Sequence, residues 1–429
     1  MRLFNIVFIC FFLLLPVFLY PACKEAAGLS QVANIVIPLN KINNIRDLKR
    51  IKYIKNYYEF KNAPYIDIQL DKSSVEKFKD LIFKKFNIKV KVDGFKKPFY
   101  VIPDDPLFYD QWYLDYMGVP KLWDYLQTNP SENFSSKETI IAIIDTGVDL
   151  DHPELKNKLW INPYEVPNNG IDDDMNDYID DIHGINSDCM GCKSQNIDAT
   201  ECSNHGTFMA GIIAAEKNNS IGIAGLAPDN TRVMICKAGT DNGMANSSVF
   251  RCIDYIIEMK KRGFNIIAIN MSYGGSQKSD VEEHLLSQLA VYNILPVIAA
   301  GNEDNNLDFK PTYPASYKLD YSIVVGSFNP KGKKSSYSNF GTQTVDIFAP
   351  GDDILTTAYV YGEHGYGVAS GTSISTPMVA SAIAYIYNFY PASDIYRLKE
   401  HLIDNSLSKR KLRFYGKSGK TLDFENLLN

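Results

Sequence analysis

The sequence predicts an α/β protein with a doubly wound, mostly parallel sheet, preceded by a small α+β unit. Two observations predict this class. From residue 103 onward, short apolar runs alternate with longer stretches of helical periodicity, as in parallel strands joined by crossover helices. Residues 65–102 instead hold short strand-like runs around one amphipathic helix. The chain of 429 residues is 45% hydrophobic and 22% charged, an ordinary globular composition with ample length for a large core.

The amino terminus has the pattern of an export signal. After Arg2, residues 6–20 are almost wholly apolar, a length that suits a signal-peptide core better than a membrane span. We expect residues 1–22 to be a signal peptide and the protein to be exported, to the extracellular space, the periplasm or the cell surface. The segment YPAC ending at Cys23 partly matches a lipidation motif, which would make Cys23 a membrane anchor. Cleavage by an ordinary signal peptidase is the alternative.

A basic leader follows. Residues 24–102 carry 17 basic and 8 acidic side chains, a net charge of +9, whereas residues 103–429 have 26 basic and 42 acidic ones, a net charge of −16. Alternation predicts a strand over 65–70, and Ser73 to Glu76 has the pattern of a capping box. The residues expected on one face of the helix that follows are Val75, Phe78, Leu81, Ile82 and Phe86. Further strands are expected over 88–92 and 95–102, giving a small sheet with a helix on it.

Residues 103–429 are expected to form one domain. Its predicted strands cover 140–144, 232–237, 266–270, 295–300 and 323–325. Its predicted helices cover 248–262, 281–292 and 373–389. Pro377 is expected in the first turn of the last helix, where a missing amide costs little. Open parallel sheets gather catalytic groups at the carboxyl ends of their strands, so polar residues that follow strands are the candidates for a site.

One segment, ASGTSISTPMVASAI over 369–383, places Ser373 on a glycine-led turn at the start of an apolar helix. A serine hydroxyl attacks only when a base takes its proton, so a nucleophilic Ser373 needs a histidine, a group that orients this histidine and an oxyanion donor. The helix start also offers partial positive charge and free amides where negative charge would develop. Ser373 is therefore the candidate nucleophile.

All three partners are found upstream of Ser373. Asp145 ends the apolar strand TIIAIID and is expected to orient the base. His205, in NHGTFMAGIIAA, lies in the first turn of a helix that Asn204 is expected to cap, and it is the candidate base. Asn302 follows the strand VIAAG, where its amide can donate to an oxyanion. Each residue alone is more often structural, but their joint occurrence points to catalysis.

These segments resemble the subtilases, the subtilisin-like serine proteases. DTGVDLDHPEL, HGTFMAGIIAA, AAGN and GTSISTP stand in the family's order, and the resemblance runs from about Asp105 to the carboxyl terminus. It implies a serine endopeptidase that hydrolyses peptide bonds through an acyl-enzyme, with Asp145 orienting His205, and with Asn302 and the Ser373 amide binding the oxyanion. The leader over 23–102 then resembles a prosegment, an inhibitor and folding assistant removed by autoprocessing. A permanent amino-terminal subdomain is the alternative.

The same resemblance implies a substrate cleft. The segment NMSYGG matches the family's edge for an extended peptide, formed here by Ser272, Tyr273 and Gly274. One wall of the primary pocket, open to a large apolar side chain, would be Ala299, Ala300 and Gly301. The expected partners are polypeptide substrates and the chain's own prosegment, with no nucleic acid. The positions that depart from the family pattern, and that are expected to pack behind the site, are Phe208, Ile374, Met378 and Ser381.

Two calcium sites are expected, because calcium takes several oxygen ligands. By the family resemblance, the first would be held by Asp105, Glu154 and Asn219, although Glu154 replaces a usual aspartate. The second is the stretch GIDDDMNDYIDD, whose acids would repel one another without a cation. Its candidate ligands are Asp172, Asp174, Asn176, Asp180 and Asp181. A solvated acidic loop is the alternative for each site, and no cofactor is expected for catalysis.

The cysteines are less informative. Cys189, Cys192 and Cys202 crowd the segment before His205, and in an oxidising compartment we expect one disulfide among these three, with the pairing open. A zinc site there would need a fourth ligand. Cys236 and Cys252 fall in a strand and a helix, where we expect buried free thiols.

Two other functions remain open at this point. The first is a catalytically silent binding protein with the subtilase fold, against which the complete set of Asp145, His205, Asn302 and Ser373 argues. The second keeps the chemistry but restricts it, as a dedicated processing protease for one exported precursor.

Overall fold

The computed structural model describes residues 32–38, 48–49, 51–59, 65–86, 88, 102–130, 134–188, 195–200 and 203–428. These residues form two compact units, divided at about residue 100. The expected signal peptide, Cys23 and the cysteines Cys189, Cys192 and Cys202 lie outside the described residues. None of the helices in the described part of the chain has both the length and the apolar character that crossing a membrane requires.

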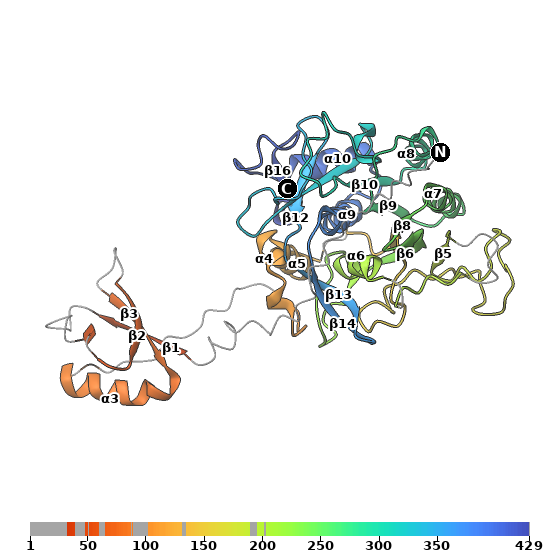
Figure 1. Ribbon diagram of the computed structural model, residues 1–429. Coiled ribbons are helices and arrows are strands. Elements are labelled where there is room, and N and C mark those ends of the chain that lie inside the picture. The colour runs from red at the N-terminus through yellow and green to blue at the C-terminus, as the bar shows by residue number, and fades with distance from the viewer. Residues whose placement is uncertain are drawn as a thin grey trace, which may run out of the picture. The chain divides into compact units, whose positions relative to one another are not determined.

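The first unit is a three-stranded antiparallel sheet with one helix (Figure 1). In sheet order its elements are β1 (Val32–Pro38), β3 (Tyr65–Asp71) and β2 (Ile54–Glu59), with α3 (Val75–Phe86). Strand β3 and helix α3 confirm the predicted strand and helix. The other two strands precede them in the chain. Of the strands expected over 88–92 and 95–102, only Ile88 and Ile102 are among the described residues, and neither lies in a strand.

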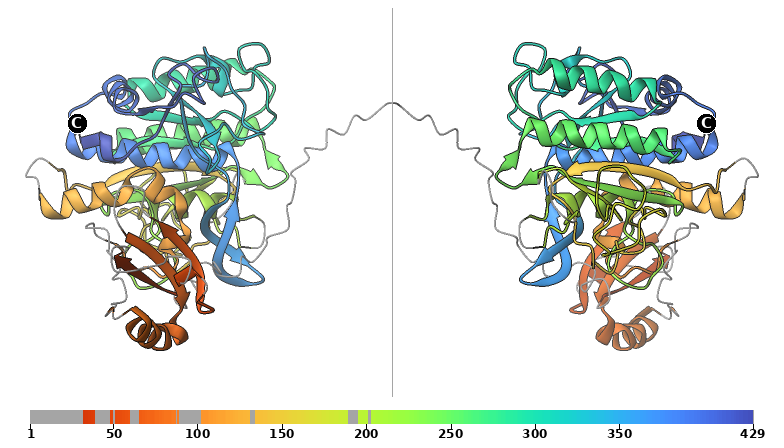
Figure 2. Two further views of the ribbon diagram at one scale, coloured as in Figure 1. Left: turned by 90° about the vertical axis from the view of Figure 1, so that its left-hand side faces the viewer. Right: turned by 90° about the vertical axis from the view of Figure 1, so that its right-hand side faces the viewer.

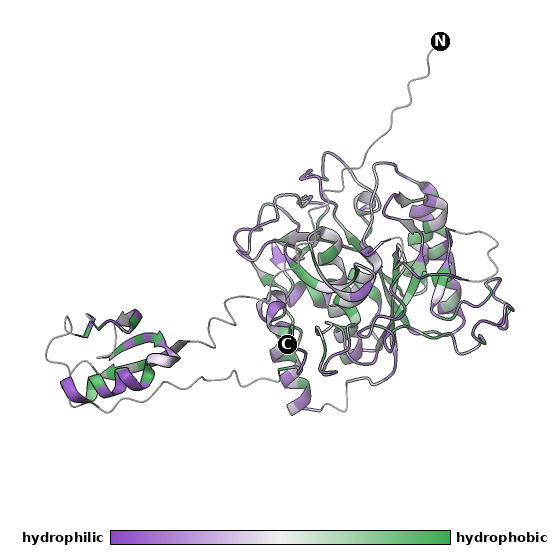
Figure 3. Cartoon of the chain, turned by 60° about the horizontal axis from the view of Figure 1, so that its bottom comes forward, coloured by the Kyte–Doolittle hydropathy of each residue, from purple (hydrophilic) through white to green (hydrophobic). Residues whose placement is uncertain are grey.

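Helix α3 is amphipathic, with apolar and polar residues alternating along it in Figure 3. Val75, Phe78 and Ile82 are buried against isoleucines of β1 and β3. Leu81, expected on the same face, is 36% exposed. At about 100° per residue it lies at the edge of the buried stripe, so the prediction for Leu81 was wrong.

The second unit is built on a nine-stranded sheet, which confirms the predicted fold class. All neighbouring strands are parallel except the last pair, β15 and β16, at one edge. In sheet order the strands are β15 (Leu407–Ser408), β16 (Lys420–Thr421), β12 (Ile347–Pro350), β11 (Ile323–Phe328), β10 (Leu295–Ala299), β9 (Ile266–Met271), β4 (Thr139–Asp145), β6 (Thr231–Lys237) and β5 (Gly184–Asn186). Two hairpins lie outside this sheet, β7 (Gly239–Thr240) with β8 (Gly243–Met244) and β13 (Ile354–Val360) with β14 (Glu363–Ala369).

Helices cover both faces of the sheet (Figures 1 and 2). One face packs against α4 (Trp112–Tyr116), α5 (Val119–Thr128), α6 (His205–Ala214), α9 (Thr372–Phe389) and α10 (Ile395–Asp404). The other face packs against α7 (Asn246–Lys261) and α8 (Asp280–Val291). Strand β4 shows how the sequence allows this, because Ile141 and Ile143 belong to the first cluster whereas Ile140 and Ile144 belong to the second. Burial on both faces explains its unbroken apolar run.

Helix α9 is buried along almost its whole length, as its apolar sequence predicts. The helix begins at Thr372, one residue before the expected start, so Pro377 is its sixth residue and lies in the second turn and not in the first. At this place its missing N–H leaves the carbonyl of Ser373 without its helical donor. The Ser272 hydroxyl donates to this carbonyl at 2.9 Å, so the cost of the proline is offset by a residue that follows β9.

The prediction of free thiols at Cys236 and Cys252 was wrong. These residues form a disulfide between β6 and α7, with Cα atoms 5.7 Å apart. The strand and the helix pack face to face in the second cluster, at a separation that a disulfide spans. Periodicity placed each cysteine on a buried face but carried no information about which faces meet.

Candidate functional site

The four predicted catalytic residues meet at one edge of the large sheet. Asp145 ends β4, Asn302 follows β10, and His205 and Ser373 lie in the first turns of α6 and α9. Ser272, the residue after β9, lies between them in the sheet order and bonds to Ser373. Asp145, His205, Ser272, Asn302 and Ser373 are called the sheet-edge cluster below.

Asp145 and His205 form a tight pair. The Nδ1 atom of His205 lies 2.8 and 2.9 Å from the two carboxylate oxygens of Asp145. The Asp145 side chain is fully buried and also accepts from the Thr146 amide at 2.8 Å. Because an ionised carboxylate can only accept, Nδ1 carries the proton and Nε2 is left as the basic nitrogen.

A glycine lets α6 approach the end of β4. A Cβ atom on Gly206 would lie 1.9 Å from the carbonyl oxygen of Gly147, so a larger residue here would push His205 away from Asp145. Asn204 does not cap this helix, contrary to expectation. Its side chain instead bonds both the amide and the carbonyl of Tyr359 in β13, while the hydroxyl of Ser203 accepts from the His205 amide at 3.1 Å.

The environment of His205 favours its charged form. Burial lowers its pKa, but the charge of Asp145, the hydrogen bond to Asp145 and the charge of Asp241 raise it, and the net pKa lies above the ordinary value of 6.5. The side chain is 22% exposed, so one side of the ring faces outward. A histidine held in this way can accept a proton on Nε2 and be stabilised as the cation.

Ser373 makes a reciprocal pair of bonds with Ser272. Its hydroxyl donates to the Ser272 carbonyl at 3.3 Å, and the Ser272 hydroxyl donates to the Ser373 carbonyl at 2.9 Å. Asn270 donates to the Ser272 hydroxyl at 3.0 Å, which fixes it from behind. Between the two described side chains of Ser373 and His205 there is no hydrogen bond in this arrangement. The long 3.3 Å bond leaves the Ser373 hydroxyl easily redirected.

Two hydrogen bonds to its side-chain oxygen fix the orientation of Asn302. Its Oδ1 accepts from the Thr372 amide at 2.9 Å and from the Thr372 hydroxyl at 3.0 Å. The Thr372 hydroxyl in turn accepts from the Gly301 amide. Since Oδ1 already accepts these two bonds, Nδ2 is the side-chain atom left to donate, and no described residue accepts a hydrogen bond from it. A Cβ atom built on Gly371 would lie 3.5 Å from this Nδ2 and 3.7 Å from the Ser373 amide nitrogen, so both donors flank the same point.

The residues predicted to bind substrate lie beside this point. The main-chain groups of Tyr273 and Gly274 bond to no other described backbone group, whereas Gly275 pairs with Tyr313 in both directions at 2.8 Å. The Tyr273 side chain packs against the second cluster, and its buried hydroxyl lies beside the Glu282 carboxylate without a hydrogen bond of ordinary geometry in the described structure. Burial and the charge of Glu282 hold the pKa of Tyr273 well above its ordinary value.

The residues expected to form the pocket wall are packed into the structure. Ala299 is 5% exposed and Ala300 is fully buried. The Asn339 side chain donates to the Ala300 carbonyl at 2.9 Å and accepts from the Glu303 amide at 3.1 Å. These two bonds stabilise the turn after β10. The positions that depart from the family pattern pack behind the cluster as expected, since Ile374, Met378 and Ser381 are buried and Phe208 is partly buried. A surface hollow of about 560 Å³ at α10 involves none of these residues.

The first expected calcium site brings its three residues together but satisfies them with protein donors. Glu154 is fully buried and accepts from the Asn219 amide group at 2.8 Å, the Ile223 amide at 2.9 Å and the Tyr366 hydroxyl at 2.9 Å. The carboxylate of Asp105 accepts from two further backbone amides. Burial raises the pKa of Glu154, and the charge of Asp105 adds to this. The three side chains thus lie together with two carboxylates among them, and a calcium site here stays a prediction.

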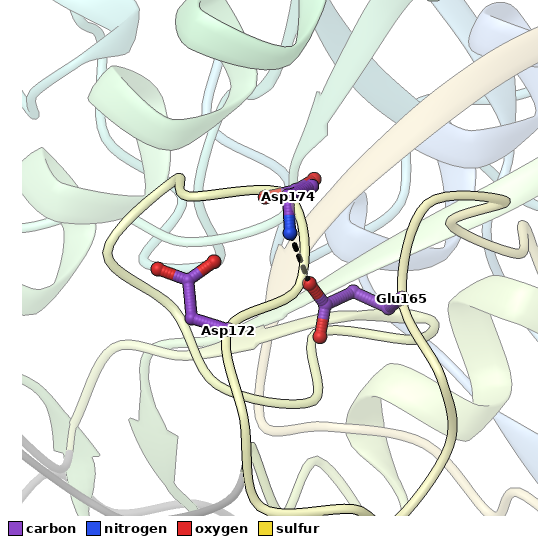
Figure 4. Close-up of side chains that lie close together, drawn as sticks. All are labelled: Glu165, Asp172 and Asp174. Atoms are coloured by element: carbon purple, nitrogen blue, oxygen red, sulfur yellow. Dashed lines mark hydrogen bonds between the residues drawn. The ribbon is translucent and has the colours of Figure 1, made fainter.

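The second expected site is partly assembled. In Figure 4 Asp172, Asp174 and Glu165 lie together, with the Asp174 amide donating to Glu165, and one oxygen from each of the three lies within 4.8 Å of the others. Oδ1 of Asp174 is buried and without a hydrogen bond in the described structure, although Arg262 lies 3.5 Å from it. Three carboxylates and an orphaned oxygen fit a hard cation such as calcium. The sequence analysis missed Glu165, an isolated acid seven residues before Asp172 in the same loop.

The other three predicted ligands bond elsewhere in this loop. Asp180 accepts from the amides of Asn169 and Gly170. Asn176 donates to Asp181 at 2.9 Å. Asp181 is fully buried and also accepts from the Tyr255 hydroxyl. Burial raises the pKa of Asp181 to about 7, against the lowering effect of these bonds. These bonds hold the loop together and also tie Asp181 to α7.

The chain is similar to known proteases. The model of the subtilase family matches residues 136–421. Subtilisin-like protease 1 of Plasmodium berghei (strain Anka) is 31% identical over 345 residues, covering 75% of this chain and 53% of that protein. The major intracellular serine protease of Bacillus subtilis (strain 168) is 31% identical over 301 residues, covering 68% of this chain and 80% of that protein.

Solved structures support the fold. The proteases from Pseudoalteromonas arctica PAMC 21717 align with a TM-score of 0.59 at 24% identity, over 76% of this chain and 99% of that one. The chain spans about half the length of several relatives that it matches, 53% in the case of the Plasmodium berghei protein. The family model covers well over half of the sequence and includes the whole sheet-edge cluster. The chain therefore belongs to the subtilase family of subtilisin-like serine endopeptidases.

Proposed function

We propose that this chain is an exported serine endopeptidase that cleaves polypeptides through an acyl-enzyme on Ser373 and is made as a zymogen that removes its own leader. The observation that supports this most is the sheet-edge cluster. His205 is paired with Asp145 so that Nε2 remains basic, and the Asn302 amide and the Ser373 amide flank one point beside Gly371. A base and two donors around one hydroxyl are what acyl transfer requires.

The roles follow from this geometry. His205 removes the proton of Ser373 as its hydroxyl attacks the substrate carbonyl, and the carbonyl carbon gains a bond to Oγ. The negative oxygen that forms is stabilised by Asn302 Nδ2 and the Ser373 amide. His205 then gives its proton to the leaving amine, and water repeats the sequence to release the acyl group. Asp145 stays ionised and stabilises the histidine cation.

The free backbone groups of Tyr273 and Gly274 suit an extended peptide, which would add a strand at this edge. Ala299, Ala300 and Gly301 would form the wall of the pocket for the residue before the cut. Small side chains there favour a large apolar residue. Since the Tyr273 side chain is turned into the core, its backbone and not its ring would contact the substrate.

The leader and the export of the chain are also part of the proposal. The leader's charge of +9 against −16 for the rest would attract the two parts, and would do so less strongly at high salt. Its tail, PFYVI before Pro103, would be the first substrate. The Cys236–Cys252 disulfide supports export, because such bonds persist in oxidising compartments. Cys23 would anchor the chain if it is lipidated.

Calcium would be held by Glu165, Asp172 and Asp174, where its charge would offset the repulsion of three acids. This role is structural, since the loop contributes no residue to the sheet-edge cluster. Asp105, Glu154 and Asn219 would hold a second calcium ion, with Asp105 and Glu154 supplying carboxylate oxygens.

The testing experiment compares the full-length precursor with its Ser373→Ala variant by intact mass, amino-terminal sequencing and hydrolysis of a panel of unrelated unfolded proteins. We expect only the parent to lose its leader near Ile102 and to degrade most of the panel. A parent that keeps its leader and degrades nothing would contradict the proposal and favour a binding protein. Cleavage of the leader alone would indicate a dedicated processing protease.

A further inference from the structure

A second carboxylate acts on His205 from outside the Asp145 pair. The hydroxyl of Ser203 accepts from the His205 amide at 3.1 Å and donates to Oδ1 of Asp241 at 2.5 Å. We propose that Asp241 and Ser203 are positioning residues for His205, with Ser203 fixing the start of α6 and Asp241 setting the acid limit of proteolysis. This inference rests on the proposed function, because it concerns the base of that same site.

The two bonds place Ser203 between elements that are otherwise separate. Asp241 lies in the turn of the hairpin β7–β8, directly after β6. Strand β6 pairs with β4 so that Lys237 is the partner of Asp145, and the Ala238 amide donates to the Asp145 carbonyl at 2.8 Å. The backbone that carries Asp145 and the turn that carries Asp241 are therefore joined. Asp145 bonds the His205 ring directly, whereas Asp241 is linked to the His205 backbone amide through Ser203.

Burial makes Ser203 a fixed link. Ser203 is 9% exposed, and its hydroxyl uses its one donor on Asp241 and one of its two acceptor positions on the His205 amide. Asn204, next in the chain, is fixed to Tyr359 of β13. Ser203 and Asn204, the two residues before His205, are thus both held by hydrogen bonds of their side chains. This leaves the first residue of α6 little freedom to rotate away from Asp145.

The charges that act on His205 come from two elements. Burial opposes the charged ring, whereas Asp145 at the end of β4 and Asp241 in the β7–β8 turn both favour it. The nearby cation, Lys237, donates its Nζ to the carbonyl of Asp198 at 2.7 Å and is not among the groups that shift His205. Asp145 is buried and Asp241 is exposed, so salt screens only the Asp241 contribution effectively.

The direction of the effect is fixed by this arrangement. A negative charge at Asp241 keeps His205 protonated to higher pH, and a protonated His205 cannot act as a base. Removing that charge should lower the pKa of His205 and extend activity to lower pH. Removing the Ser203 hydroxyl leaves the charge in place and should instead loosen the ring, which lowers kcat and leaves KM nearly unchanged.

The test uses the full-length chain carrying Ser373→Ala, so that it neither cleaves itself nor needs to be active. The pKa of His205 is measured by NMR on protein with ¹³C-labelled histidine, with the signal assigned by its loss in His205→Gln. Asp241→Asn, which can still accept from Ser203, is compared with Glu363→Gln, which removes an exposed charge from β14. We expect a lower pKa for Asp241→Asn only, with the difference shrinking at 1 M salt.

The second arm measures kcat and KM against pH in the active enzyme for Ser203→Ala and Ser203→Thr. A lost hydrogen bond of ordinary strength predicts a fall in kcat of roughly two- to tenfold for alanine, and recovery with threonine. For Asp241→Asn the acid limb should move to lower pH with the plateau retained.

Two results would overturn the inference. An unchanged His205 titration in Asp241→Asn would remove the electrostatic part, and a Ser203→Ala enzyme with parental kcat, or one that threonine fails to rescue, would remove the positioning part. If the parent were as inactive as its active-site variants, the proposed function would be refuted. The NMR titration would still decide the role of Asp241 in that case.

Discussion

The sheet-edge cluster holds one buried carboxylate, Asp145, whereas the acidic loop, residues 160–183, gathers several, and the two regions hold them in different ways. At the sheet edge Asp145 ends a buried strand and accepts from Thr146 and His205. The acidic loop contains no helix or strand, and the buried Oδ1 of Asp174 makes no hydrogen bond in the described structure, with the Arg262 guanidinium 3.5 Å away. Rigid elements can aim a carboxylate at a partner, whereas the acids of a loop repel one another, and a bound cation would offset this repulsion.

This difference predicts a separation of effects. Changes at the sheet edge should alter turnover and leave thermal stability nearly unchanged, because their groups do not hold the core together. Changes in the acidic loop should alter stability and calcium dependence while the sheet edge keeps its chemistry.

Asp145→Asn should have the largest effect among these changes. An asparagine amide donates to Nδ1 and leaves the proton on Nε2, the wrong nitrogen for a base. We expect kcat to fall roughly 10⁴-fold, the magnitude known for the equivalent change in another serine protease. Steady-state kinetics with a peptide substrate measure this, and circular dichroism should show an unchanged fold. A loss below tenfold would mean that Asp145 does not orient the base.

Asn302→Leu should come next, with kcat reduced roughly 10² to 10³-fold and KM almost unchanged, figures carried over from subtilisin. The amide is needed most when the oxyanion forms, so ground-state binding should persist. Thr372→Val provides a matched control, because it removes a hydroxyl that orients Asn302 but leaves the amide itself. Equal losses in kcat and in binding would argue that Asn302 contributes only to packing.

Calcium removal should destabilise the protein through the acidic loop, by a free energy comparable with the activation free energy lost in Asn302→Leu. A ligand present at about 100 times its dissociation constant stabilises by about 2.7 kcal/mol, which a chelator would abolish. Asp174→Asn should reproduce most of this loss and make the chelator ineffective, as measured by thermal unfolding. Asp308→Asn, an acid outside this loop, serves as the control. A melting temperature that ignores calcium in the parent would refute the site.

Ser272→Ala should cost less than the changes at Asp145 and Asn302. It leaves the Ser373 carbonyl without a donor, because Pro377 cannot supply one. We expect kcat to fall roughly tenfold through a less defined first turn of α9. Hydrogen exchange of the α9 amides should rise in the variant, and unchanged exchange with unchanged kcat would show that the bond is dispensable.

Tyr273→Phe should have the smallest effect. The Tyr273 hydroxyl is buried with no hydrogen bond in the described structure, so its removal should be neutral or slightly stabilising. Denaturant unfolding measures this, with activity expected to stay within twofold. A clear loss of stability would reveal a bond between Tyr273 and Glu282.

The sequence predicted the parts of the molecule that depend on local pattern. The run Ile140 to Ile144 predicted β4 and the position of Asp145, because strand ends and apolar periodicity are local properties. Contacts between elements were not predictable in this way. The Cys236–Cys252 disulfide, the turning of Tyr273 into the core and the role of Asn204 all depend on which faces meet. Glu165 was missed because the loop folds back on itself without a regular period.

The central claim is that His205 and Asp145 make Ser373 a nucleophile, and labelling tests it most directly. The processed protein, Ser373→Ala and His205→Ala would each be treated with a fluorophosphonate, and the adduct located by peptide mass spectrometry. The account predicts stoichiometric phosphonylation at Ser373 in the parent, none in Ser373→Ala and a greatly slowed reaction in His205→Ala. Labelling at another residue, or equal rates in the parent and His205→Ala, would contradict it.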